Sequence, residues 1–121
     1  MDTKEIEKVI QSYFEAGNTC NGNLMAEIFH EVAHLYAVGE DGALVNWDID
    51  FFSNRVNSNE PGFPIYNEIL SIDFTGENAA VARVKVRIKD TLFTDILSFL
   101  RIEGEWKIIA KVFAGVPANQ S

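Results

Sequence analysis

The sequence predicts an α+β domain in which three N-terminal helices cover one face of a curved antiparallel sheet. Apolar residues recur mainly at helical spacing up to about residue 57 and alternate with period two after it. Four long alternating segments then follow one another, separated only by the turns Gly76-Glu77-Asn78, Asp90-Thr91 and Glu103-Gly104. Helices followed by a meander of strands indicate the α+β class.

The first helix is predicted from apolar positions spaced three and four residues apart: Ile6, Val9, Ile10, Tyr13 and Phe14. Asp2 and Glu5 can form a capping box at its start, and Gly17 is a predicted stop. A short second helix follows, with Asn21 or Asn23 as its cap. Its apolar side consists of Leu24, Met25, Ile28 and Phe29.

A strand over 32–38 is predicted next, turning at Asp41-Gly42 into a second short strand that ends near Asn46. Asp48 can cap a third helix, whose inner face holds Ile49, Phe52 and Val56. The polar segment 57–62 is predicted to be a loop because of its Asn, Ser, Pro and Gly content.

The four long strands are predicted over 65–74, 79–89, 92–102 and 106–114. In the second of these, Val84, Val86 and Ile88 alternate with basic residues, so one face points inward. The last two strands carry apolar residues on both faces, with Val112 expected on the same face as Trp106 and Ile108. Helices cover one side of a sheet, so we expect a second copy of the chain to cover the other in a homodimer. Coverage by the C-terminal tail is the alternative.

Length and charge limit the classes of function. A chain of 121 residues predicts one domain spanning 1–121. Its net charge of −8 disfavours nucleic acid and membrane surfaces as partners. Cys20 is the single cysteine, and the N-terminal segment does not resemble a signal peptide, so a cytoplasmic location is expected.

The order of elements resembles the nuclear transport factor 2-like superfamily, and within it the small bacterial proteins called putative lumazine-binding or SnoaL-like. The resemblance covers roughly 5–114. It rests on Tyr13-Phe14, Phe29-His30, Trp47-Asp48, Phe93-Thr94-Asp95 and the hairpin segment from Gly104 to Phe113. It implies a cone of curved sheet closed by three helices, with an internal pocket and usually a dimer. It implies no particular activity, because one fold hosts many functions.

The segment His30-Glu31-Val32-Ala33-His34 matches the H-E-x-x-H pattern of zinc hydrolases. That pattern requires a helix through both histidines, whereas the segment after Val32 has the composition of a strand. A zinc hydrolase is therefore the least favoured of the functional hypotheses. No metal and no cofactor are expected.

The superfamily also contains ketosteroid isomerase, which implies a tyrosine donor on the first helix and two acidic groups on strands. Tyr13 stands at the tyrosine position. The base position falls near Ala37 or Val38, and the second donor falls near Ser98. Two of the three groups are therefore missing.

Asp95 lies in an otherwise nearly apolar strand, where a carboxylate needs a partner because burying it alone costs several kcal/mol. It is either the polar anchor or general acid of a pocket, or a surface or paired group without function. Lys111 in the last strand is either a functional amine of lowered pKa or a surface group. With two-residue turns, Ser98 and Lys111 share one face and Asp95 lies on the other. The sequence leaves open which set lines the pocket.

The leading hypothesis is a binding protein for a small, largely apolar or aromatic molecule. Its expected ligand-binding residues are Tyr13, Phe29, Trp47, Phe52, Asp95, Ser98, Lys111 and Phe113. The alternative is a cofactor-free lyase, isomerase or hydrolase in which Asp95 acts as acid/base and Tyr13 as hydrogen-bond donor.

Overall fold

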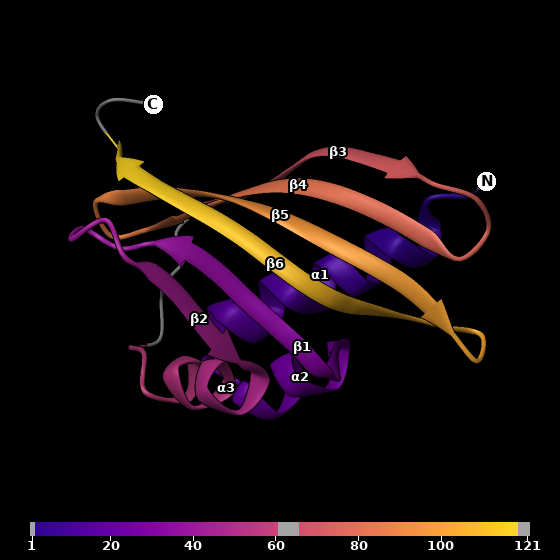
Figure 1. The fold of residues 1–121 in the computed structure, drawn as a ribbon, viewed down its shortest axis with the longest axis horizontal. Coiled ribbons are helices and arrows are strands. Elements are labelled where there is room, and N and C mark those ends of the chain that lie inside the picture. Colours follow the sequence, from indigo (N-terminus) through magenta and orange to yellow (C-terminus); the bar gives the residue numbers. More distant parts are fainter. Residues whose placement is uncertain (1, 61–65, 119–121) are drawn as a thin grey trace.

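One sheet of six strands, in the order β2-β1-β6-β5-β4-β3, forms the framework of the protein (Figure 1). The computed structural model describes residues 2–60 and 66–118. The elements in chain order are α1 (Lys4–Asn18), α2 (Gly22–Ile28), β1 (Phe29–Val38), β2 (Leu44–Asp48), α3 (Ile49–Asn57), β3 (Tyr66–Phe74), β4 (Ala79–Ile88), β5 (Thr91–Ile102) and β6 (Glu105–Pro117). All neighbouring strands are antiparallel except β1 and β6, which are parallel. The α+β prediction is confirmed.

α1 lies against the inner face of the sheet and supplies much of its cover (Figure 1). Its buried residues Ile6, Ile10 and Tyr13 follow the predicted helical spacing. Thr3 occupies the N-cap position, whereas Asp2 was expected there. The predicted stop at Gly17 is wrong, because the helix runs to Asn18 and Cys20 takes the left-handed φ of 55° that ends it.

The two short helices begin at capping side chains. Asn21 caps α2, its Oδ1 accepting a hydrogen bond from the Leu24 N–H at 3.0 Å. Asp48 caps α3 as predicted, its Oδ1 accepting from the Phe51 N–H at 2.8 Å. Because Asp48 is also the last residue of β2, this cap directs the chain from the sheet edge into the helix that covers the pocket.

Two-residue turns set the register of the long strands. The turn between β5 and β6 is Glu103-Gly104, both with positive φ, of 51° and 83°. The turn between β4 and β5 lies one residue earlier than predicted, at Lys89-Asp90, and Lys89 has a φ of 54°. The parity of the β4–β5 pairing is nevertheless the expected one, and it places Asp95 opposite Val84 on the inner face. Part of the strand predicted over 65–74 lies outside the described residues, at position 65.

A β-bulge at Ile109 changes the inward face of β6. Phe99 pairs with Ile108 but Ser98 pairs with Ala110, so Ile109 is the extra residue. Trp106 and Ile108 therefore point inward before the bulge, and Lys111 points inward after it. The prediction that Val112 shares the face of Ile108 is wrong for this reason.

The outer face of β5 and β6 exposes apolar side chains. Ile96 and Val112 face each other across the two strands and are 38% and 48% exposed. That a second copy of the chain covers this face stays a prediction.

We expect Val112→Lys to raise the dissociation constant of such a dimer at least about tenfold, because it places a charge in an apolar interface. Analytical ultracentrifugation measures this. Phe51→Lys is the matched control, because Phe51 is equally exposed, at 48%, but lies on α3 and not on the outer face of β5 and β6. A wild-type chain that sediments as a monomer at high concentration contradicts the prediction.

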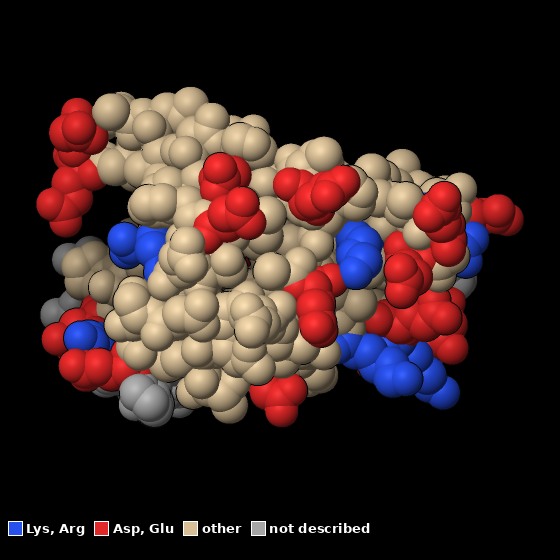
Figure 2. All heavy atoms as spheres, turned by 90° about the horizontal axis from the view of Figure 1, so that it is seen from below, with Lys and Arg blue, Asp and Glu red and all other residues tan. Residues whose placement is uncertain are grey.

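Acidic side chains outnumber basic ones on the side of the molecule shown in Figure 2, where they surround a broad uncharged area. Within the described residues, the helices are too short or too polar to cross a bilayer.

Candidate functional site

A pocket of about 240 Å³ lies between the helices and the inner face of the sheet. Exposed Arg55 and Asn59, at the end of α3 and just beyond it, belong to its wall, so the pocket opens there. The lining residues are Tyr13, Phe14, Gly17, Met25, Trp47, Phe52, Arg55, Val56, Asn59, Asn67, Val86, Ile88, Phe93, Asp95, Lys111 and Phe113. Most of these are apolar or aromatic, which is typical of a small-molecule site.

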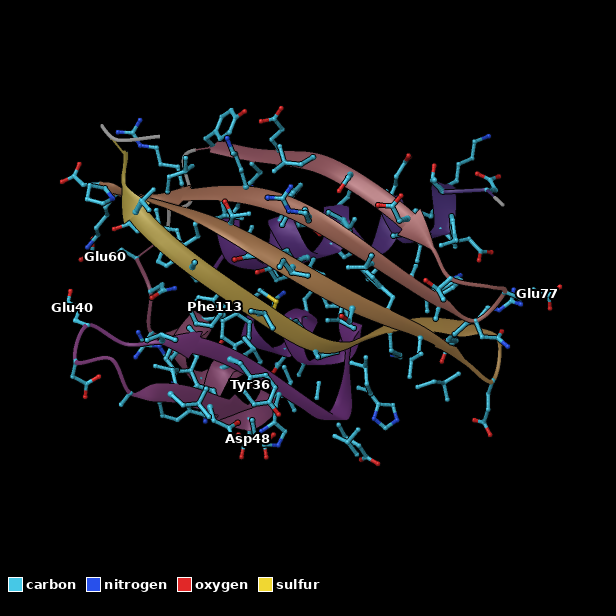
Figure 3. All side chains as sticks on the ribbon, turned by 45° about the horizontal axis from the view of Figure 1, so that its top comes forward. Tyr36, Glu40, Asp48, Glu60, Glu77 and Phe113 are labelled. Carbon is cyan, nitrogen blue, oxygen red and sulfur yellow. The ribbon has the colours of Figure 1, made fainter. Side chains whose placement is uncertain are left out.

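Aromatic rings form one wall of the pocket. The rings of Trp47 and Phe52 are nearly parallel, 17° apart, with centroids 6.5 Å from each other. Phe113, labelled on β6 in Figure 3, lies with its ring centroid 5.6 Å from that of Trp47. The Arg55 guanidinium lies over the Trp47 ring, 4.7 Å from its centroid. These rings give a ligand a flat apolar surface.

Three polar side chains from distant parts of the chain meet at the inner end of the pocket. The Tyr13 hydroxyl, from α1, donates a hydrogen bond of 2.6 Å to Asp95 Oδ2 on β5. Lys111 Nζ on β6 lies 3.6 Å from the same oxygen, forming an ion pair. Asp95 is 2% exposed and Lys111 6% exposed, so both charges are buried. We call these three residues the polar cluster.

The Lys111 ammonium is surrounded by aromatic faces. Its Nζ lies 4.6 Å from the ring centroid of Phe52, 4.9 Å from that of Phe113 and 5.2 Å from that of Tyr13. Cation–π attraction of this kind favours the charged amine. No hydrogen bond from Nζ to another described residue is formed, so its N–H groups are available to a ligand.

Burial shifts the pKa of two members of the polar cluster. Removal from water lowers the pKa of the Lys111 ammonium, and the neighbouring Asp95 charge opposes that shift without cancelling it. Burial raises the pKa of the Tyr13 hydroxyl well above its ordinary value, and the charge of Asp95 and the hydrogen bond to it raise it further. Tyr13 is therefore a hydrogen-bond donor at neutral pH.

Two acceptor atoms among the lining residues have no hydrogen-bond partner within the described part of the chain. They are Asp95 Oδ1 and Asn67 Oδ1, both buried. The Asn67 amide nitrogen is occupied, since it donates to Asn18 Oδ1 at 3.2 Å. An unpaired buried acceptor costs about 1–3 kcal/mol, so a ligand with N–H or O–H groups would relieve an existing penalty.

Six of the eight expected ligand-binding residues lie in the pocket wall: Tyr13, Trp47, Phe52, Asp95, Lys111 and Phe113. Phe29 is not part of the wall. It is buried next to Phe52, and the two rings pack edge to face with their centroids 5.9 Å apart. Ser98 lies on the outer face of β5, three residues from Asp95 in a strand without a bulge at that point. The prediction that Ser98 and Lys111 share a face is wrong, because the bulge at Ile109 turns Lys111 inward and leaves Ser98 opposite Ala110.

Sequence reasoning missed Arg55 and Asn67 as wall residues. Arg55 is the basic residue in the last turn of α3, one position before the inward Val56. Asn67 shares the parity of Ile69 in β3, so the alternation of that strand was a usable signal. Both supply polar groups near the pocket, and neither is close to the polar cluster in sequence.

The H-E-x-x-H segment lies in β1 and not in a helix, because α2 ends at Ile28. His30 Nδ1 accepts a hydrogen bond from the Val32 N–H, and His34 Nδ1 lies 2.6 Å from Asn46 Oδ1. The two histidines thus make separate local contacts and do not share a helix face. Residues 2–60 and 66–118 contain no group of three or more candidate metal ligands.

Three helices packed on one face of a curved, open sheet, with a pocket between them, define the NTF2-like (nuclear transport factor 2-like) fold. The chain belongs to the family described as "Putative lumazine-binding", whose model matches residues 1–114. Family and fold together indicate a ligand-binding domain. No curated protein matches the chain.

Solved structures of similar proteins share the whole architecture. An NTF2-like protein of unknown function from Shewanella baltica OS155 has a TM-score of 0.86 at 27% identity, over 94% of this chain and 93% of that one. Another, from Methylobacillus flagellatus KT, has a TM-score of 0.85 at 29% identity, over 95% and 92%. A third, from Silicibacter pomeroyi DSS-3, has a TM-score of 0.80 at 22% identity, over 96% and 100%, and shows the fold alone.

Proposed function

We propose that this protein binds a small planar molecule, its ring against the aromatic wall and its polar group at the polar cluster. The observation that carries the proposal is the pocket itself: an apolar and aromatic wall with a buried Tyr13–Asp95–Lys111 cluster at one end. Natural small-molecule sites combine such a wall with a few fixed polar groups. The pocket volume of about 240 Å³ lies below the usual ~300–1,000 Å³ of sites for drug-sized ligands, so the ligand is small.

The polar cluster selects the ligand's functional group. Within the described residues, Lys111 Nζ has an ion pair with Asp95 Oδ2 at 3.6 Å but makes no hydrogen bond, while Asp95 Oδ1 accepts none. A ligand that presents both a carbonyl oxygen and an N–H or O–H group satisfies the two at once. We therefore favour an aromatic amide, lactam or similar heterocycle over a hydrocarbon.

Benzamide and methyl benzoate test this choice as a matched pair of probes. Both have a phenyl ring and a carbonyl oxygen, but only benzamide has N–H groups for Asp95. We expect benzamide to bind about tenfold more tightly, since a hydrogen bond to a charged group is worth about 1.5–3 kcal/mol. Chemical-shift changes in NMR titrations measure both affinities.

Variants show whether the probe occupies this pocket. Phe52→Ala removes part of the aromatic wall and is expected to weaken benzamide binding about tenfold, because aromatic contacts carry area and stacking energy. Phe74→Ala is the control, since Phe74 is half-buried like Phe52 but packs against Trp106, outside the lining. Asp95→Asn is expected to keep the fold and bind benzamide less tightly. Equal affinities for wild type and Phe52→Ala would contradict the proposal.

A cofactor-free enzyme is the second candidate function. The 2.6 Å hydrogen bond between Tyr13 and Asp95, inside a pocket, favours it, because such a pair supplies a base and a donor. A catalytic Asp95 would show itself by product formation from a bound molecule, lost in Asp95→Asn while binding remains.

A further inference from the structure

Lys111 is placed differently from its neighbour Lys107 on the same strand. Lys107 precedes the bulge at Ile109, and its Nζ donates to the Glu27 carbonyl at 2.5 Å. Lys111 follows the bulge, and its amine lines the pocket, where its Nζ lies 3.6 Å from Asp95 Oδ2 and makes no hydrogen bond to residues 2–60 or 66–118. The amine of Lys107 is thus held by a hydrogen bond and that of Lys111 is not, so Lys107 is a suitable comparison for Lys111.

We propose that Lys111 is a carbonyl-reactive residue, whose amine condenses reversibly with a small aldehyde or ketone bound in the pocket. The proposal rests on the proposed function, because the pocket must first admit a small molecule. It adds a covalent step and a substrate class to that function. The carbonyl group of the bound compound would lie at the inner end of the pocket, and the apolar part of the compound would lie against the aromatic wall.

Burial in an apolar site favours the neutral amine that this reaction needs. The negative charge of Asp95 opposes this, but Asp95 Oδ2, 3.6 Å from Nζ, is placed to take the ammonium proton when the amine reacts. The surrounding rings of Phe52 and Phe113 exclude water, and burial lowers the pKa of the ammonium. Tyr13 holds Asp95 in place through its hydrogen bond to the same oxygen.

The condensation balances within the polar cluster. Asp95 takes a proton from the ammonium, and the freed Nζ lone pair attacks the carbonyl carbon, forming a C–N bond as the C=O π electrons move to the oxygen. A second proton then moves from the nitrogen to that oxygen, which becomes a hydroxyl. That hydroxyl leaves as water when Asp95 returns its proton, and a protonated imine with a C=N bond remains on Lys111. The net change is ammonium plus carbonyl compound to iminium plus water.

The aromatic faces around Nζ suit the iminium product as well as the ammonium. Both are cations, and three ring centroids lie 4.6–5.2 Å from the nitrogen. The iminium is a larger and more delocalised cation, which loses less hydration in an apolar site. The pocket volume limits the carbonyl compound to a small one, for which benzaldehyde is a suitable probe.

Reductive trapping with benzaldehyde and sodium cyanoborohydride tests the proposal, because the reductant converts an imine into a stable benzylamine. Mass spectrometry counts the benzyl groups, and peptide mapping assigns them among the lysines. At neutral pH we expect Lys111 to be labelled at least about tenfold faster than Lys107, as a preorganised amine in a binding pocket should be. Lys111→Arg keeps the positive charge next to Asp95 and is expected to abolish the fast labelling. Lys107→Arg is expected to leave it unchanged.

The benzamide titration separates the two proposals. Labelling spread evenly over the lysines, in a protein that binds benzamide, overturns the role of Lys111 and leaves the binding function standing. Absence of both benzamide binding and fast labelling overturns both proposals. Fast labelling that survives in Lys111→Arg also overturns the assignment, since the reactive amine would then lie elsewhere. Excess benzamide that slows the labelling of Lys111 supports both.

Discussion

Lys111→Met is expected to lower the free energy of unfolding by about 3–5 kcal/mol, because it leaves the Asp95 carboxylate buried without its cationic partner. Asp95 is 2% exposed, so water cannot replace the lost charge. One of its oxygens already has no hydrogen-bond partner within the described residues. Methionine has nearly the volume of lysine, so packing changes little. Urea denaturation followed by circular dichroism measures the difference.

A control and a double variant separate the buried charge from other effects. Lys107→Met removes an amine from the same strand but leaves Asp95 paired, so its cost is expected to stay below about 1.5 kcal/mol, the net worth of one hydrogen bond. Lys111→Met combined with Asp95→Leu removes both charges and is expected to be more stable than Lys111→Met alone. A double variant that is less stable than the single one would contradict this account.

The helices and their starts could be predicted because their signals are local. Asp48 lies directly before an apolar pattern of helical spacing, and its side chain caps the helix in the structure. Asn21 does the same for α2. The end of α1 was not predictable from Gly17, because a non-glycine residue, Cys20, takes the left-handed conformation three positions later. Local signals therefore located the elements, with errors at both ends of α1, at one turn and at two strand ends: β1 begins at Phe29, before the predicted 32, and β6 runs to Pro117, beyond the predicted 114.

The composition of the polar cluster could not be predicted, because it depends on one extra residue in β6. Regular alternation from the Glu103-Gly104 turn places Lys111 on the face opposite Asp95. The bulge at Ile109 reverses the alternation and brings the two together. Ile109 has no glycine or polar character that marks a bulge. Apolar residues of both parities in this strand were the available sign, and they were attributed to a sheet buried on both faces.

The contact between Tyr13 and Asp95 also could not be predicted from the sequence. The two residues are 82 positions apart and come from a helix and a strand. Each was recognised singly, Tyr13 from the resemblance and Asp95 from its apolar surroundings. Their meeting depends on how α1 crosses the inner face of the sheet, which helical and strand periods do not determine.

The same contact makes the alkaline stability of the protein depend on Tyr13. Its pKa is raised by burial and by Asp95 in the folded chain, whereas in the unfolded chain it has the ordinary value of 10.0. Above pH 10 the unfolded chain loses this proton first, so the Tyr13 contribution to stability falls as pH rises. Lys111 acts in the opposite sense. The Lys111 pKa is 10.5 in the unfolded chain and lower in the folded chain. The contribution of Lys111 to the free energy of unfolding therefore rises with pH up to about pH 10.5.

Tyr13→Phe is therefore expected to cost about 1–3 kcal/mol at pH 8, because Asp95 Oδ2 loses its hydrogen-bond donor. That deficit is expected to narrow above pH 10, since only the wild type then loses stability through Tyr13 ionisation. Urea denaturation at several pH values between 8 and 11 measures both quantities. Tyr66→Phe is the control for the cost at pH 8: the Tyr66 hydroxyl donates to Glu68 at 2.5 Å on the surface, where such a contact adds little. A Tyr13→Phe deficit that stays constant up to pH 11 would mean that the folded chain does not hold the Tyr13 proton more tightly than the unfolded one.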